Sequence, residues 1–192
     1  AYRVDVQRPC DVVEDILRIY GYNNVEIPTQ LKSTLTIAGD VDKAHHRANV
    51  VSEQLVGEGF NEILNNSLTK RSYYENTGLN CYTWDNTVRV INPLSSDLGV
   101  MRQTLLFGGL ETIVRNVNRK NGNLKLFELG NTYIYKKDNW TPEAPIKAYK
   151  QEGHLAMWVT GKRVSGSWAH PDEDASFYEL KAYVENVLRR IG

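Results

Sequence analysis

A turn-rich loop ending in an arginine, followed by an amphipathic helix and then a strand that carries a glutamate, constrains the fold of this chain more than any other stretch. The loop runs from Ile91 to Arg102, and the strand reads Leu126-Phe127-Glu128-Leu129-Gly130. Several nucleotide-using folds build the floor of a site from these parts in this order. The residues leave two roles open for Arg102, which can clamp a phosphate or pair with Glu128 or Glu111 to fix the loop.

The spacing of apolar residues predicts an α+β fold in which an antiparallel sheet is flanked by helices. Capping signals and apolar stripes predict four helices, at about 11–20, after Asp40 up to Gly57 and Gly59, from Leu106 to a stop at Asn121-Gly122, and after a Ser176/Glu179 capping box. Alternation predicts strands at 60–68, 87–91, 124–129, 132–136 and 154–160, with a tight Gly130-Asn131 turn joining the third and fourth into a hairpin. Because helices arrive separately and strands arrive in hairpin-like runs, a doubly wound parallel sheet is disfavoured.

Composition excludes several classes of function. The 192 residues carry 23 basic and 23 acidic side chains, so no global field draws the chain to nucleic acid or anionic lipid, and any RNA contact must be local. Cys10 and Cys81 stand 71 positions apart, which argues against a disulfide framework and a zinc site. No apolar run approaches the ~20 residues that span a bilayer. We expect a soluble fragment of a longer protein.

Four carboxylates near the N-terminus form the candidate metal site, and they are Asp5, Asp11, Glu14 and Asp15. Carboxylate oxygens are the ligands that Mg²⁺ prefers. The simpler explanation is that Asp11 caps the first helix, that Glu14 closes the capping box and that the acids favour the positive helix end. Spacing alone favours the capping explanation.

Aromatic side chains and histidines give weaker signals. We expect most of the aromatic residues in the C-terminal half to pack in the core rather than stack on bases, and this set comprises Trp140, Trp158, Trp168, Tyr133, Tyr135 and Tyr178. His45 and His46 point in adjacent directions on their helix and do not form a ligand set. Lys162 and Arg163 are the basic spot on a loop that looks mobile. The glycine-rich motifs of P-loop and dinucleotide-binding folds are absent from the sequence.

Several long motifs, in order along nearly the whole chain, resemble the β subunit of bacterial phenylalanine–tRNA ligase. They are Arg3-Val4-Asp5-Val6, the run from Asp11 to Asn24, Asn92-Pro93-Leu94-Ser95 through Met101-Arg102, Leu126-Phe127-Glu128-Leu129-Gly130 and Phe177-Tyr178-Glu179-Leu180-Lys181. The resemblance implies that residues 1–22 end the domain called B5, that 23–39 are a connector, and that 40–192 form the catalytic-like B6/B7 module, which is related to class II synthetases. It also implies that Asp5, Asp11, Glu14 and Asp15 are Mg²⁺ ligands in the intact subunit, which reverses the balance between metal binding and capping.

The resemblance further implies a cytoplasmic α2β2 tetramer that joins phenylalanine to tRNA(Phe) with ATP and Mg²⁺, with aminoacylation performed by the α subunit. The helix at about 41–58 corresponds to the class II dimerisation motif and would contact α, which agrees with the small residues Ala44 and Ala48. Arg102 precedes a helix instead of lying in a Phe-Arg-x-Glu strand, and no glycine-rich motif ending in arginine occurs before Gly192. We therefore expect no catalytic residues in this chain, a scaffold role and no contact with DNA or membranes.

Two other functions stay open. A stand-alone class II-like adenylate-forming ligase predicts ATP–pyrophosphate exchange by the chain itself. A plain RNA-binding module predicts salt-sensitive tRNA binding, which the zero net charge disfavours.

Overall fold

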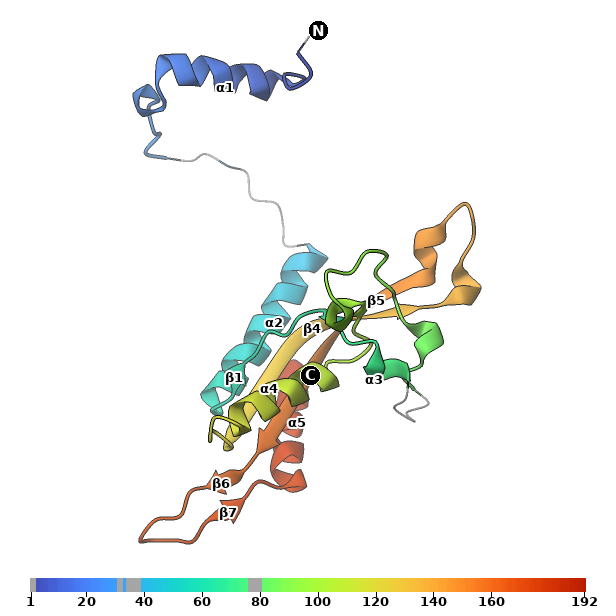
Figure 1. The fold of residues 1–192 in the computed structure, drawn as a ribbon. Coiled ribbons are helices and arrows are strands. Elements are labelled where there is room, and N and C mark those ends of the chain that lie inside the picture. Colours follow the sequence, from blue (N-terminus) through green and yellow to red (C-terminus); the bar gives the residue numbers. More distant parts are fainter. Residues whose placement is uncertain (1–2, 31–32, 34–38, 76–80) are drawn as a thin grey trace. The chain divides into compact units, whose positions relative to one another are not determined.

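The computed structural model of the protein describes residues 3–30, 33, 39–75 and 81–192, which belong to two units, 1–38 and 39–192 (Figure 1). In the first unit, helix α1 spans Pro9–Tyr20 and a single turn, η1, spans Tyr22–Asn24. The sequence predicted that Asp11 caps this helix. That prediction is wrong, because Asp11 is the third residue of the helix and Arg8 is the N-cap. Pro9 starts the helix because its fixed φ suits the first position and the missing N–H is not needed there. The connector expected at 23–39 lies partly outside the described residues.

The second unit is built on a three-stranded sheet with the order β1-β4-β5. Strands β4 (Leu124–Tyr135) and β5 (Tyr149–Thr160) pair antiparallel along their whole length, whereas β1 (Asn61–Glu62) pairs parallel to β4. The predicted hairpin turn at Gly130-Asn131 is wrong, because β4 continues through it and Gly130 pairs with His154. The glycine meets a steric need instead, since a Cβ at this position would lie 2.4 Å from Nη2 of Arg102.

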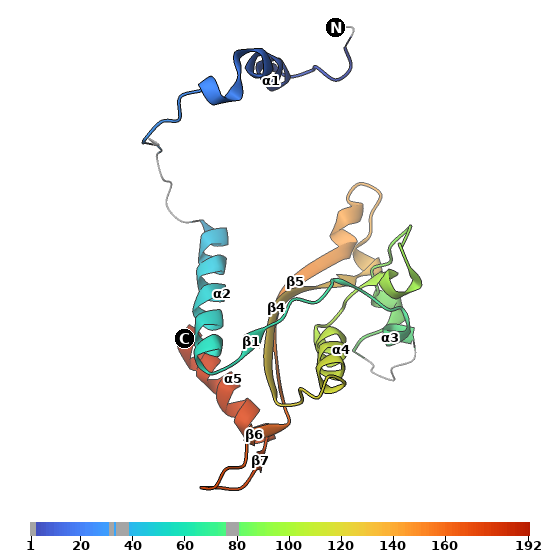
Figure 2. The same ribbon diagram turned by 60° about the vertical axis from the view of Figure 1, so that its left-hand side comes forward.

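Helices cover both faces of the sheet (Figure 2). Helices α2 (Asp40–Gly57) and α5 (Phe177–Ile191) pack on one face, and α4 (Leu106–Val117) packs on the other. Alternate residues of β4 serve the two layers, so Phe127 joins the core under α2 and α5, while Leu126 joins the core under α4. The predicted α+β class, an antiparallel sheet flanked by helices, is confirmed.

Close packing brings α4 against the sheet at Gly109, where a Cβ would meet the Trp158 ring at 2.1 Å. Trp158 is 9% exposed, as expected for a core aromatic. The same expectation is wrong for Trp168, which is fully exposed in the loop between β6 (Lys162–Val164) and β7 (Glu173–Asp174), for Trp140, and for Tyr178 at the start of α5. The Ser176 cap of α5 is confirmed, because its hydroxyl accepts a hydrogen bond from the Glu179 N–H.

The strands predicted at 60–68 and 87–91 are present only as short pieces. β1 is followed by β2 (Leu68–Thr69), which pairs with β3 (Val100–Met101), and Arg89 makes an isolated bridge to Val100. Between β1 and β2, the backbone N–H of Asn65 donates to the Glu128 carboxylate and not to a neighbouring strand, so the ladder breaks there.

Short helical turns complete the second unit. They are α3 (Ser72–Glu75), η2 (Trp84–Asn86), η3 (Ser96–Leu98), η4 (Lys137–Asn139) and η5 (Pro145–Ala148). Among the described residues, no helix is long and apolar enough to cross a membrane.

Candidate functional site

Arg102 and Glu128, the pair that the sequence marks as a possible nucleotide site, form a buried ion pair. Nη1 of Arg102 lies 2.6 Å from Oε1 of Glu128, and the two side chains are 7% and 0% exposed. Glu128 points from β4 toward the layer of α4, and Arg102 follows β3 at the end of the turn-rich loop. A charge pair this deeply buried is stable only when its remaining donors and acceptors also find partners.

Backbone and side-chain groups supply partners for Nε and Nη1 of Arg102 and for both oxygens of Glu128. The Nε of Arg102 donates to the Asn131 carbonyl at 2.9 Å, and Nη1 also reaches the Asn65 carbonyl at 3.3 Å. The second oxygen of Glu128 accepts from the Asn65 amide at 2.7 Å, while the Asn65 amide oxygen accepts from the Thr112 hydroxyl at 2.8 Å. The network therefore joins the loop, the sheet and α4.

This geometry decides between the two roles of Arg102 in favour of pairing with Glu128. Two of its three guanidinium nitrogens already donate to protein oxygens, and the carboxylate that would take an amine or a metal is fully enclosed. Glu111, the other proposed partner, instead accepts hydrogen bonds from the Tyr73 hydroxyl and from Lys70. The bond from Tyr73, together with that from Lys70, lowers the pKa of Glu111.

The sequence identified Arg102 and Glu128 but missed Asn65, Thr112 and Gly130. Asn65 gave a faint signal, because it is a polar residue in a stretch with apolar alternation. Gly130 gave the opposite signal, because glycine followed by asparagine is typical of a hairpin turn. Nothing in the sequence indicated that the absence of a Cβ serves the close approach of a guanidinium from a distant loop.

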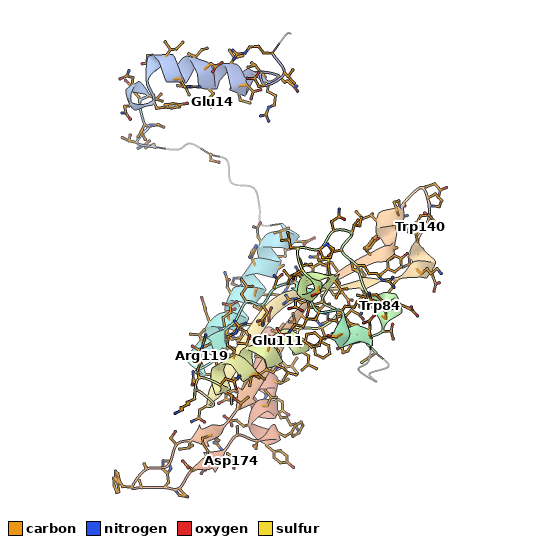
Figure 3. All side chains as sticks on the ribbon, viewed as in Figure 1. Glu14, Trp84, Glu111, Arg119, Trp140 and Asp174 are labelled. Carbon is orange, nitrogen blue, oxygen red and sulfur yellow. The ribbon has the colours of Figure 1, made fainter. Side chains whose placement is uncertain are left out.

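The four carboxylates of the predicted metal site lie in the first unit, on α1 and just before it; Figure 3 labels Glu14. In the part of the chain that the structure describes, no three His, Cys, Asp or Glu side chains gather closely enough to hold a metal ion. One oxygen of Asp11 accepts from the backbone N–H groups of Gln7 and Arg8 at 3.0 and 2.8 Å, and the other faces the Arg8 guanidinium at 3.3 Å.

These contacts at Asp11 determine its ionisation. The hydrogen bonds from the backbone N–H groups of Arg8 and Gln7 lower the pKa of the Asp11 carboxyl. Oxygen donors of this type suit Mg²⁺, and in the described part of the chain they do not gather around a common point. Asp11 instead stabilises the first turn of α1.

The small residues of α2 line a hollow of about 710 Å³. Val41, Ala44 and Ala48 form one wall on α2, Leu129 and Leu155 of the sheet form the floor, and Ile191 closes the end on α5. The lining is mainly apolar. The short side chains of Ala44 and Ala48 therefore leave an apolar hollow beside α2.

The basic spot predicted at Lys162 and Arg163 is neutralised by ion pairs. Lys162 lies 2.7 Å from Asp174, which Figure 3 labels, and Arg163 lies 3.8 Å from Glu173. The hydrogen bond with Asp174 raises the pKa of Lys162. These two cations are not available to a phosphate without breaking their pairs.

Comparison with known proteins gives a consistent result. Residues 27–192 match the family described as "Phenylalanyl tRNA synthetase beta chain CLM domain", and residues 1–22 match the "tRNA synthetase B5 domain". The "Phenylalanine--tRNA ligase beta subunit" of Bacteroides thetaiotaomicron is 62% identical over the whole chain, and that of Porphyromonas gingivalis is 51% identical. The chain spans 23% of the length of these two relatives.

Among solved structures, a pyrrolysyl-tRNA synthetase from Desulfitobacterium hafniense superposes with a TM-score of 0.45 and 13% identity. The superposition covers 77% of this chain and 43% of that protein.

Proposed function

The chain belongs to the phenylalanine–tRNA ligase beta-subunit family, and from this premise we propose that its second unit is a non-catalytic assembly module that contacts the alpha subunit. The observation that carries the proposal is the buried Arg102–Glu128 ion pair with its surrounding hydrogen bonds. A residue that stabilises a transferring phosphate has to direct its donors at the ligand. In this chain, Nε and Nη1 of Arg102 donate to Asn131, Asn65 and Glu128 instead.

Support for assembly comes from the hollow beside α2. Its wall of Ala44 and Ala48 allows a helix to pack closely, and its apolar floor provides surface that association would remove from water. We propose that a helix of the alpha subunit lies along this stripe in an α2β2 tetramer. The whole enzyme would then join phenylalanine to tRNA(Phe) with ATP in the cytoplasm.

A substitution on α2 tests the contact. Ala48→Arg places a long charged side chain in the hollow and should prevent the full-length beta subunit from co-purifying with the alpha subunit. Asn49→Arg is the matched control, because the next position adds the same charge on the same helix but does not line the hollow. Equal recovery of the alpha subunit with both variants contradicts the proposed contact.

The rival function is a stand-alone adenylate-forming ligase. It predicts that the chain by itself catalyses phenylalanine-dependent ATP–pyrophosphate exchange, whereas the scaffold role predicts none. Exchange that is lost in Arg102→Gln would overturn the scaffold proposal.

The magnesium site stays a prediction for the full-length subunit. In the described part of this chain, Asp5, Asp11, Glu14 and Asp15 do not gather around a common point. When bound to such a site, the ion would supply charge neutralisation for the four carboxylates. We propose that the remainder of the B5 domain is needed to assemble them.

A further inference from the structure

A pocket of about 310 Å³ lies between η2 and the loop end of the β4–β5 hairpin, and its lining does not include Arg102 or Glu128. Its lining combines two aromatic rings with two cations, and includes Thr87, Asp85, Arg89, Tyr135, Lys137 and Tyr149. Figure 3 labels Trp84 beside this hairpin and Trp140 at the hairpin's far end. We propose that this pocket binds an unpaired nucleotide of single-stranded RNA.

The aromatic part of the pocket is built for stacking. Tyr135 and Tyr149 end the two paired strands directly opposite each other, and their ring centroids lie 5.3 Å apart with a tilt of 49°. Tyr149 is 52% exposed, so one ring stands open to solvent. Unpaired bases bind proteins mainly through stacking of this kind, since every base has a π face.

The cationic part is held in place by a third aromatic side chain. The Arg89 guanidinium lies over the Trp84 ring at 4.3 Å, and Arg71 lies over that ring at 4.5 Å. Arg71 also pairs with Glu75. For Arg89 and Lys137, no carboxylate lies within ion-pair distance in the described part of the chain. These two cations are therefore available to a phosphate.

Charge at this end of the unit extends beyond the pocket. Residues 135–150 contain four lysines, at 136, 137, 147 and 150, against the two acids Asp138 and Glu143. Lys150 forms an ion pair with Glu152. Asp85 is the one acidic residue among those that line the pocket. Several cations in and near a stacking pocket suit a chain of phosphates. Zero net charge over the whole protein is compatible with this local excess.

The assignment of single-stranded RNA as the ligand rests on the pocket alone. Its further identification as transfer RNA rests on the proposed function. The test uses the 192-residue chain and a fluorescein-labelled oligocytidine of ten nucleotides, followed by fluorescence anisotropy. Association with the alpha subunit is not part of the assay, so failure here is distinct from failure of the assembly proposal.

We expect Tyr149→Ala to weaken binding roughly 5- to 150-fold, because stacking on one base is lost. Tyr178→Ala removes a tyrosine on α5 that is more exposed than Tyr149, at 78% against 52%, and should leave the affinity unchanged. Arg89→Gln and Lys137→Gln should each reduce the salt dependence by about 0.7 in the slope of log Kd against log salt, as expected for one lost phosphate contact on a single strand. Lys181→Gln, an exposed cation on α5, is the control for charge.

Asp85→Asn should tighten binding, because it removes a negative charge beside the phosphate position. Three results overturn the proposal. They are equal effects of Tyr149→Ala and Tyr178→Ala, equal affinity for a blunt RNA duplex and the single strand, and displacement of the oligonucleotide by AMP at the concentration at which the unlabelled ten-mer displaces it.

Discussion

Gly130→Ala tests whether the Arg102–Glu128 network holds the second unit together. The added Cβ would lie 2.4 Å from Nη2 of Arg102, 3.0 Å from Cδ2 of Leu105 and 3.2 Å from Oε1 of Glu128. Since real Cβ contacts are not this short, the guanidinium has to move. The matched control is Gly153→Ala on β5, where the nearest atom, Oδ1 of Asn131, lies at 3.8 Å.

The expected magnitude follows from three effects. Replacing a strand glycine by alanine stabilises by about 0.5–1 kcal/mol through the unfolded chain, and this gain is common to both variants. Overpacking costs about 1–3 kcal/mol. Loss of one partner of a buried ion pair costs about 3–5 kcal/mol. A partial displacement of the Arg102 guanidinium from Glu128 should cost only part of this amount. We expect Gly130→Ala to be less stable than Gly153→Ala by about 2–4 kcal/mol.

Urea unfolding followed by tryptophan fluorescence measures this difference. All four tryptophans, at 84, 140, 158 and 168, lie in the second unit, so the signal does not report on α1. At about 2–4 °C per kcal/mol for a domain of this size, the melting temperature should fall by about 4–16 °C relative to the control.

A double-mutant cycle then identifies the cause. Once Arg102→Ala has removed the guanidinium, Gly130→Ala should cost much less than in the wild-type chain. A difference between the two glycine variants below about 0.5 kcal/mol, or equal costs of Gly130→Ala with and without Arg102, refutes the reasoning.

The remaining predictions concern pH and metal. Because hydrogen bonds from Tyr73 and Lys70 lower the pKa of Glu111 in the folded state, its contribution to stability is present above its ordinary pKa of 4.5 and is lost as the pH falls through the lowered value. In Glu111→Gln, the unfolding free energy should therefore fall less steeply below pH 4.5 than in the wild-type chain. Equal pH dependence of the two proteins in urea unfolding contradicts this prediction. Isothermal titration of the 192-residue chain with MgCl2 should show no saturable binding, because its carboxylates do not gather. In the full-length subunit, Asp11→Asn should weaken Mg²⁺ binding, and unchanged binding there sinks the ligand assignment.

Local sequence signals predicted the helices well and the strands less well. The Ser176 cap, the stop after Gly57 and the apolar stripe from Leu106 are all local, and the structure places helix ends at or near each of them. The strands depend on partners elsewhere in the chain. Asn65 breaks its ladder because Glu128, 63 residues away, takes its N–H. The alternation of apolar and polar residues cannot show that a distant side chain accepts a backbone N–H in place of a neighbouring strand.

The candidate site shows the same division. Arg102 and Glu128 were recognisable as a pair, but their role depended on whether a ligand or the protein supplies the other contacts. Asn131 and Asn65 supply them through backbone carbonyls, and backbone groups carry no sequence signature. The residues themselves offered four carboxylates as a candidate metal site, and the resemblance then favoured Mg²⁺ binding over capping. The local geometry around Asp11 instead matches the capping explanation that the residues had favoured, although with Asp11 in the third helical position.

The long pairing of β4 with β5 has a consequence for the order of folding. Its two strands are separated by only thirteen residues, so their ladder closes a short loop at low entropic cost. Helices α2 and α5 come from opposite ends of the unit and meet only on the surface that this ladder provides. We infer that the β4–β5 ladder is the nucleus on which the distant segments condense, and that α5 covers Phe127 only once this ladder has formed.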